Sequence, residues 1–162
     1  MIEIRPILSE ELPAARKVIL TVAQHYYKWE EPFDEIYLRF VRDGVLDDLE
    51  DVQEHYLNQQ GIFLVALEGD MVIGTGAIRR LEDTTCELKR LWLLEAYQGQ
   101  GIGLHMTQML LDFARSQHFR LVRLKTSPNQ VRAIRFYQRL GFHRVDQGYQ
   151  SQDDLVYELD IS

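Results

Sequence analysis

The sequence feature that most constrains the fold is the glycine turn Gln98-Gly99-Gln100-Gly101-Ile102-Gly103, which joins an apolar segment to a helical one. The residues before the turn, from Cys86 to Leu94, predict a strand. After the turn, apolar residues recur with the spacing of a helix (Ile102, Met106, Met109, Leu110 and Phe113). N–H groups at a helix start have no acceptor within the helix, and the helix dipole favours negative charge there. Because glycines let a phosphate approach the backbone closely, the turn predicts a diphosphate site.

The rest of the pattern predicts a mixed α/β fold. Residues 62–67 and 71–78 have the pattern of an antiparallel hairpin, joined by the tight turn Glu68-Gly69-Asp70. Further strands are expected at 2–5, 120–126, 142–145 and 155–159, and helices at about 9–25, 30–58 (one or two), 102–117 and 131–140. An antiparallel run followed by alternating strands and helices predicts a mixed, twisted sheet of six to seven strands, with about four helices on its two faces.

Composition and charge narrow the functional classes. The chain of 162 residues, 46% of them hydrophobic, fits one globular domain spanning 1–162. A net charge of −7 argues against a nucleic-acid surface, which needs clustered Lys and Arg. The N-terminus does not resemble a secretory signal, no apolar run approaches the ~20 residues of a membrane span, and Cys86 is the only cysteine, so we expect a cytoplasmic protein. The five histidines lack the spacing of a zinc site, and no metal is expected.

Two familiar phosphate-binding motifs do not match the glycine turn. A P-loop requires a Lys and a Ser or Thr after its last glycine, whereas Leu104 and His105 follow Gly103. A dinucleotide fingerprint requires a different glycine spacing and an acidic residue about 20 positions further on, where this chain is basic between Arg120 and Lys125. Neither a nucleoside triphosphatase nor a dinucleotide-binding enzyme is favoured.

The chain resembles the GNAT superfamily of acetyltransferases. The segment 98–103 is similar to the signature Q/R-x-x-G-x-G/A, and Asn129 together with the segment 133–142 resembles the second signature of that family. Asn129 stands eight residues before Tyr137, one more than in the commonest version. The two segments lie in the right order, separated by one helix and one strand, and the resemblance extends over about residues 62–159.

The resemblance implies acetyl-CoA as cosubstrate and an amine as acceptor. In that family the strand before the glycine turn and the strand after its helix splay apart, and pantetheine lies in the opening like an added strand. The backbone near Leu93 would then polarise the thioester carbonyl, and the N–H groups of the turn would hold the pyrophosphate. The implied cofactor-binding residues are Leu91, Trp92, Leu93, Gln98, Gly99, Gln100, Gly101, Ile102, Gly103, Asn129, Ala133 and Phe136.

Two residues are candidates for acid–base catalysis under this resemblance. Tyr137 corresponds to a tyrosine that protonates the departing thiolate, and its alternative is a core position beside Phe136 and Leu140. Glu87 corresponds to a carboxylate that deprotonates the amine, and its alternative is an exposed strand residue paired with Lys89 or Arg79. Cys86 is expected to be a small core residue rather than a nucleophile, which favours direct transfer.

Other features are left open by the sequence. The acidic run Asp43, Asp47, Asp48, Glu50, Asp51 and Glu54 either steers a cationic acceptor or forms a solvated helix face. Tyr26, Tyr27, Trp29 and Phe33 either line an acceptor pocket or anchor a helix. Two alternatives to the acetyltransferase are a catalytically silent acyl-CoA-binding module of the same fold and an anion-binding interaction domain without CoA chemistry. Homodimer formation also stays open.

Overall fold

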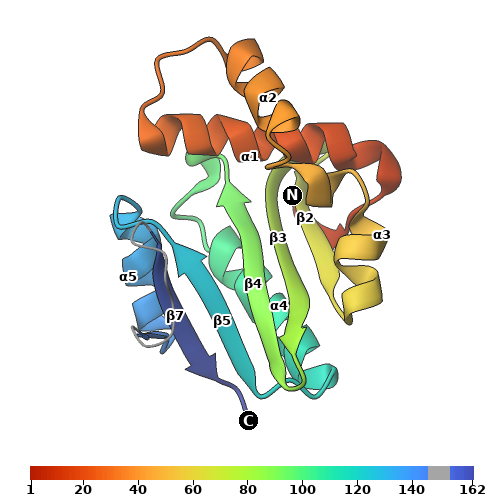
Figure 1. The fold of residues 1–162 in the computed structure, drawn as a ribbon, viewed down its shortest axis with the longest axis vertical. Coiled ribbons are helices and arrows are strands. Elements are labelled where there is room, and N and C mark those ends of the chain that lie inside the picture. The colour runs from red at the N-terminus through yellow and green to blue at the C-terminus, as the bar shows by residue number, and fades with distance from the viewer. Residues whose placement is uncertain (146–153) are drawn as a thin grey trace.

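A computed structural model describes residues 1–145 and 154–162 as a seven-stranded mixed sheet with helices on both faces (Figure 1). The strands are β1 (Ile2–Pro6), β2 (Ile62–Glu68), β3 (Met71–Glu82), β4 (Thr85–Leu93), β5 (Leu121–Thr126), β6 (His143–Arg144) and β7 (Leu155–Asp160). The α-helices are α1 (Leu12–Tyr27), α2 (Phe33–Arg42), α3 (Val52–His55), α4 (Ile102–Ser116) and α5 (Val131–Arg139). The spatial order is β1-β2-β3-β4-β5-β7-β6, and only the β4–β5 neighbours are parallel within the described ranges.

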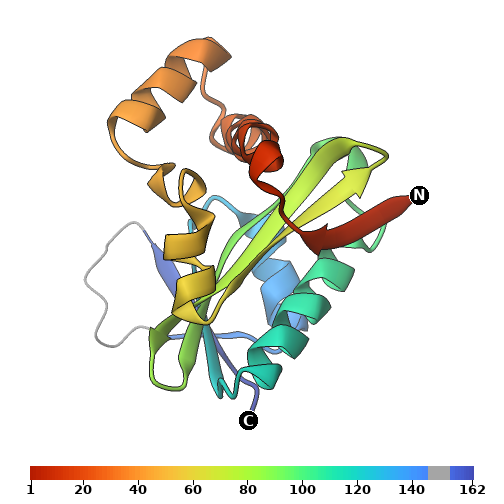
Figure 2. The same cartoon turned by 90° about the vertical axis from the view of Figure 1, so that its right-hand side faces the viewer.

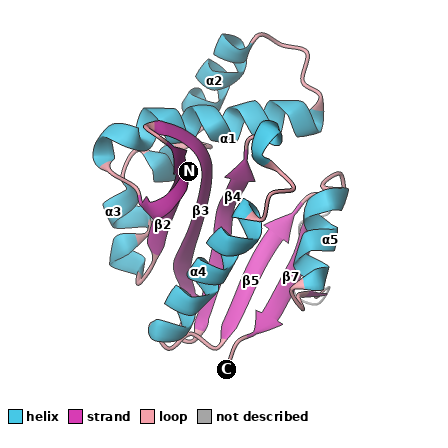
Figure 3. Ribbon diagram, turned by 180° about the vertical axis from the view of Figure 1, so that it is seen from behind, coloured by secondary structure: helices cyan, strands magenta, loops and turns pink. Residues whose placement is uncertain are grey.

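Side chains alternate between two hydrophobic cores, one on each face of the sheet. Phe63 and Val65 of β2 pack with α1, α2 and α3. Cys86 and Leu88 of β4 pack instead with α4 and α5. Figure 2 shows α2 and α3 on one side of the sheet and α4 on the other, and Figure 3 shows α4 and α5 in front of the strands. We call these the α1 face and the α4 face.

The sheet opens in its middle, between β4 and β5. These strands pair only from Thr85 to Glu87 on β4 and from Leu121 to Arg123 on β5. Both strands continue beyond that point, β4 to Leu93 and β5 to Thr126, without pairing with each other. This is the splay that the family resemblance implied, and it begins directly after Glu87.

A β-bulge in β4 lies beside this opening. Thr75 of β3 pairs with Trp92, but Ala77 pairs with Lys89, so Arg90 and Leu91 together face the single residue Gly76. Arg90 has a φ of 55°, a left-handed conformation that is uncommon outside glycine, and its carbonyl accepts a 2.6 Å hydrogen bond from the Thr75 hydroxyl. The bulge therefore lies in the part of β4 that is not paired with β5.

A buried ion pair ties the bulge to the helical segment on the α1 face. The Arg90 guanidinium donates to both carboxylate oxygens of Asp48, at 2.6 and 3.0 Å, and to the Val45 carbonyl at 2.7 Å. The Tyr56 hydroxyl donates to the same Asp48 carboxylate. The Asp48 and Arg90 side chains are only 10% and 14% exposed, so this ion pair is largely shielded from water. It joins two residues that are 42 positions apart in the sequence.

The mixed sheet and the number of its strands agree with the sequence-based prediction. The predicted closing pairing is also present, between β6 and β7, and part of the connection between these strands lies outside the described residues.

The acidic run does not form one helix face. It spans the end of α2, a 3-10 turn at Asp47–Leu49 and α3, which is also why the described residues contain five α-helices rather than four. Asp48 is buried, because Arg90 and Tyr56 satisfy its oxygens, and Asp51 caps α3 by accepting from the Glu54 N–H at 3.1 Å.

Candidate active site

The glycine turn has the geometry that the sequence predicts. Gly99 and Gly101 have φ values of 82° and 84°, which strain any residue with a Cβ. No side chain of the described residues caps α4, and its first hydrogen bond runs from the His105 N–H to the Gly101 carbonyl at 3.0 Å. The N–H groups of the first turn of this 15-residue helix therefore lack intrahelical acceptors and suit an anion.

A cavity of about 560 Å³ opens over this turn. It is bounded by the splayed end of β4, the start of α4 and one side of α5. Of the cofactor-binding residues expected from the sequence, the cavity is lined by Leu91, Trp92, Leu93, Gln98, Gly99, Gly101, Ile102, Gly103, Ala133 and Phe136. The Gln98 side chain also donates to the Leu93 carbonyl at 2.9 Å, which fixes the turn to the end of β4.

Two expected cofactor-binding residues lie outside the cavity. The exposed Gln100 side chain turns back to donate to the Ala96 carbonyl at 3.3 Å. Asn129 is exposed on the turn before α5 and lines neither cavity. Gln130, seven residues before Tyr137, lines the cavity in its place. The spacing in the sequence could have indicated Gln130.

Two cations of the cavity were missed by the sequence analysis. Arg132 and Arg139, both on α5, also line the first cavity. A Cβ added at Gly99 would lie 3.6 Å from the Arg132 guanidinium, so this cation stands next to the free N–H groups of the turn. Their seven-residue spacing places both on one side of the helix, a signal that was available in the sequence. The pair adds positive charge where a pyrophosphate or phosphate would lie.

A second cavity, of about 320 Å³, lies on the α1 face of the sheet. Leu91, Trp92, Gln130 and Tyr137 line both cavities, so the two meet at the opening between β4 and β5. Glu87 also lines the second cavity, but it is only 5% exposed, and its carboxylate accepts from the Arg79 Nε at 2.9 Å. The alternative considered for Glu87, an exposed strand residue paired with Lys89 or Arg79, holds for the pairing with Arg79 but not for the exposure.

Tyr137 lies at the junction of the two cavities. Its ring is 8% exposed and packs edge-on against Phe136 and Phe142 at centroid distances of 5.6 and 5.8 Å. Its hydroxyl makes no hydrogen bond with the described residues. Burial, with a smaller contribution from Tyr26, raises the pKa of Tyr137 above its ordinary value, so the hydroxyl stays protonated at neutral pH. Tyr137 therefore packs in the core and also lines both cavities.

The aromatic residues of the α1 region divide between the two roles considered for them. Tyr26 lines the first cavity and packs edge-on against Trp92 at 6.5 Å. Tyr27 stacks on Trp29 at 5.2 Å, and its hydroxyl accepts from the Gln130 side chain at 3.2 Å. Phe33 packs into the core of the α1 face. Only Tyr26 among them reaches a cavity, and the others fix the end of α1 and the start of α2.

The remaining candidates are set aside by their surroundings. Cys86 is fully buried in the α4 core and lines neither cavity. Burial also raises the pKa of its thiol to about 12, so the thiol is not a reactive nucleophile. Among the described residues, no three His, Cys, Asp or Glu side chains gather where they could hold a metal ion. In the same part of the chain, no helix combines the length and the apolar character that crossing a membrane requires.

Comparison with known proteins agrees with this geometry. Human N-acetyltransferase 8B is 34% identical over 117 residues, which cover 68% of this chain and 52% of that protein. N-acetylaspartate synthetase from Xenopus tropicalis is 30% identical over 112 residues, covering 68% and 41%. This chain thus spans about half the length of these relatives. The PaiA N-acetyltransferase from Thermoplasma acidophilum, solved in complex with coenzyme A, superposes with a TM-score of 0.81 at 21% identity over 99% of both chains. Residues 21–142 match the model of the acetyltransferase (GNAT) family, and the chain belongs to that family.

Proposed function

We propose that this chain is an acetyl-CoA-dependent N-acetyltransferase that transfers the acetyl group directly to an amine in a ternary complex. The observation that carries the proposal is the meeting of two cavities, one over the glycine turn and one on the α1 face, at four shared residues that include Tyr137. A cofactor and an acceptor entering from the two sides would meet at the opening between β4 and β5.

The first cavity fits a CoA-type cosubstrate. The N–H groups at the start of α4 and the Arg132 and Arg139 guanidinium groups would hold its phosphates. The edge of β4 that is not paired with β5, from Leu91 to Leu93, would hydrogen-bond the pantetheine arm and polarise the reacting carbonyl. When bound, acetyl-CoA supplies the activated thioester that makes acyl transfer favourable.

Glu87 and Tyr137 are assigned the two proton transfers. An alkylamine is mostly protonated at neutral pH, so it must lose a proton before it can attack. Glu87 lines the acceptor side at the point where the strands begin to diverge, and we assign it as the base, directly or through a water. The protonated Tyr137 hydroxyl, which has no partner among the described residues, would donate to the departing sulfur. Because burial raises its pKa, the hydroxyl stays protonated at neutral pH and can supply that proton as the thiolate leaves.

The relatives support the reaction class. Their names describe N-acetyltransferases and an N-acetylaspartate synthetase, and one structural neighbour is a complex with coenzyme A. The burial of Cys86 removes the one thiol that could form an acyl-enzyme, which favours direct attack.

Calorimetric titration with CoA, ATP and NAD tests the cofactor assignment. We expect CoA to bind and the other two nucleotides to bind at least tenfold more weakly, because their motifs are absent from the glycine turn. A parallel assay follows free thiol release from acetyl-CoA in the presence of a mixed panel of amines. CoA binding without amine-dependent thiol release would identify a silent acyl-CoA-binding module. Equal binding of all three nucleotides, or of none, would contradict the proposal.

A further inference from the structure

The cavity on the α1 face is cationic, although the chain as a whole carries a net charge of −7. Its charged lining residues are Arg79, Glu87, Lys89, Arg90 and Lys125, so a single acid faces four bases. The chain contains only four lysines, and two of them line this small space. Such a concentration of positive charge within an acidic protein indicates that the cavity binds a negatively charged group.

The two arginines of the cavity are already neutralised by protein carboxylates. Arg79 donates to Glu87 at 2.9 Å, and Arg90 donates to Asp48 at 2.6 Å. Neither guanidinium therefore needs a ligand to balance its charge.

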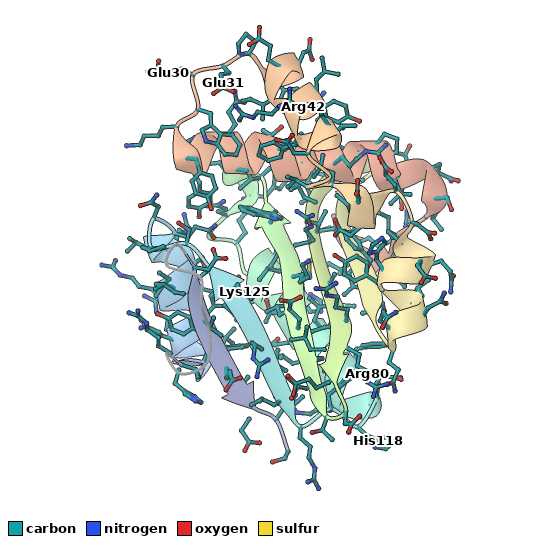
Figure 4. All side chains as sticks on the ribbon, viewed as in Figure 1. Glu30, Glu31, Arg42, Arg80, His118 and Lys125 are labelled. Atoms are coloured by element: carbon teal, nitrogen blue, oxygen red, sulfur yellow. The ribbon has the colours of Figure 1, made fainter. Side chains whose placement is uncertain are left out.

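The two lysines have no such partner. Neither ammonium group makes a hydrogen bond or an ion pair with the residues of 1–145 and 154–162. Lys89 is half-buried, and burial lowers its pKa in spite of the nearby Glu87 carboxylate. Lys125 is exposed and lies on β5, across the opening from β4, as Figure 4 shows. The two ammonium groups are thus available to a ligand from both walls of the opening.

This charge distribution selects among amines. A simple alkylammonium ion would meet two unbalanced positive charges in a confined space, which disfavours its binding. We propose that the acceptor is a small amine that also carries a carboxylate close to its amine, such as an amino acid, with the carboxylate held by Lys89 and Lys125. This inference rests on the proposed N-acetyltransferase function and specifies its acceptor.

The register of β4 supports this arrangement. Cys86 and Leu88 pack into the α4 core, so Glu87 and Lys89 project together on the α1 face, two residues apart and about 6–7 Å along the strand. An amine directed at Glu87 and a carboxylate directed at Lys89 would belong to one small molecule. The neighbouring cations would also lower the pKa of the bound ammonium, which eases the proton loss that precedes attack.

An acceptor panel tests the proposal directly. Each member is offered as a matched set of three compounds: an amino acid, its carboxamide and the amine that lacks the carboxyl group. We expect kcat/KM for the amino acid to exceed that for its carboxamide by about 10- to 150-fold, because the carboxylate forms charge-assisted hydrogen bonds that the amide does not. Equal kcat/KM values across a set, or a preference for the descarboxy amine, would overturn the inference.

Substitution of the lysines tests the assignment to these residues. Lys89→Met and Lys125→Met keep the apolar stem and remove the charge, and we expect each to raise KM for the amino acid by at least tenfold while KM for the carboxamide stays within twofold. Lys17→Met, on the exposed side of α1, is the control for loss of a lysine charge. A carboxylate preference that survives in both cavity variants would show that other residues create it.

Failure of the proposed function is separable from failure of this inference. Binding of CoA is measured by calorimetry on every preparation, together with the melting temperature. An enzyme that binds CoA and acetylates amines without preferring carboxylates contradicts only the acceptor assignment. A chain that binds no CoA, or that acetylates none of the compounds, contradicts the proposed function itself.

Discussion

Removal of the Asp48 charge should destabilise the protein strongly. In Asp48→Asn the side chain keeps its shape, but the Arg90 guanidinium, 14% exposed and bound through both oxygens of the carboxylate, loses its counter-charge. Breaking a buried pair from one side typically costs about 3–5 kcal/mol. For a chain of this length, 1 kcal/mol shifts the melting temperature by roughly 2–4 °C, so we expect a loss of about 6–20 °C.

Urea unfolding followed by tryptophan fluorescence measures this loss as a lower midpoint at an unchanged m-value. Asp47→Asn is the matched control, because Asp47 is an exposed neighbour in the same turn and should change the unfolding free energy by less than about 0.5 kcal/mol. A loss below about 1 kcal/mol for Asp48→Asn would refute the view that this pair holds the acidic segment to the bulge of β4.

The same variant should have a characteristic pH dependence. Burial raises the pKa of Asp48, but the hydrogen bond and charge of Arg90 outweigh burial, so the pKa lies below its ordinary value. A carboxyl with a lowered folded-state pKa stabilises the fold above its unfolded pKa of about 3.9, and this contribution disappears as the pH falls through the folded pKa. The stability gap between wild type and Asp48→Asn should therefore be full at pH 7 and close on acidification.

Three further substitutions test the site. Tyr137→Phe should slow the single-turnover rate by about 10²–10⁴-fold and leave the melting temperature nearly unchanged, because no described group loses a hydrogen bond; an unchanged rate would exclude the hydroxyl as the acid. Glu87→Gln keeps an acceptor for Arg79 and should lower kcat by a similar factor with unaltered CoA affinity, and a wild-type kcat would remove Glu87 as the base. Gly101→Glu should abolish CoA binding in calorimetry, because the new carboxylate repels the pyrophosphate. The control is Gly69→Glu in the β2–β3 turn, a second glycine with positive φ, which should impose similar backbone strain and leave CoA binding intact. Equal loss of binding in both variants would point to misfolding.

The sequence predicted the parts of the site that depend on local signals. The glycine turn between a strand and a helix is visible in six consecutive residues, because positive φ and free N–H groups require glycine at defined positions. The hairpin of β2 and β3, α4 and α5 were predicted for the same reason, since strand alternation, turn residues and helical spacing all act within a few positions.

The parts that were missed depend on side-chain direction and on contacts distant in sequence. Asn129 and Gln130 are adjacent polar residues on one turn, and only the path of the backbone decides that Gln130 faces the cavities. Asp48 looked like one more charge in an acidic run, because its partner Arg90 lies 42 positions away. Lys89 and Lys125 come from different strands, and the splay of β4 from β5 brings them to one cavity.

The opening between β4 and β5 gives the sheet two internal edges in addition to its outer ones. Past Glu87 and Arg123, the amide and carbonyl groups that would pair in a closed sheet have no strand partner across the opening, which makes this region a natural place for local opening of the backbone. A ligand that lies there as an added strand completes the sheet. At a concentration of one hundred times its Kd, such a ligand contributes about 2.7 kcal/mol to folding stability. A cosubstrate bound in this way would also be a structural component, and the slowest amide hydrogen exchange along β4 and β5 should belong to the loaded protein.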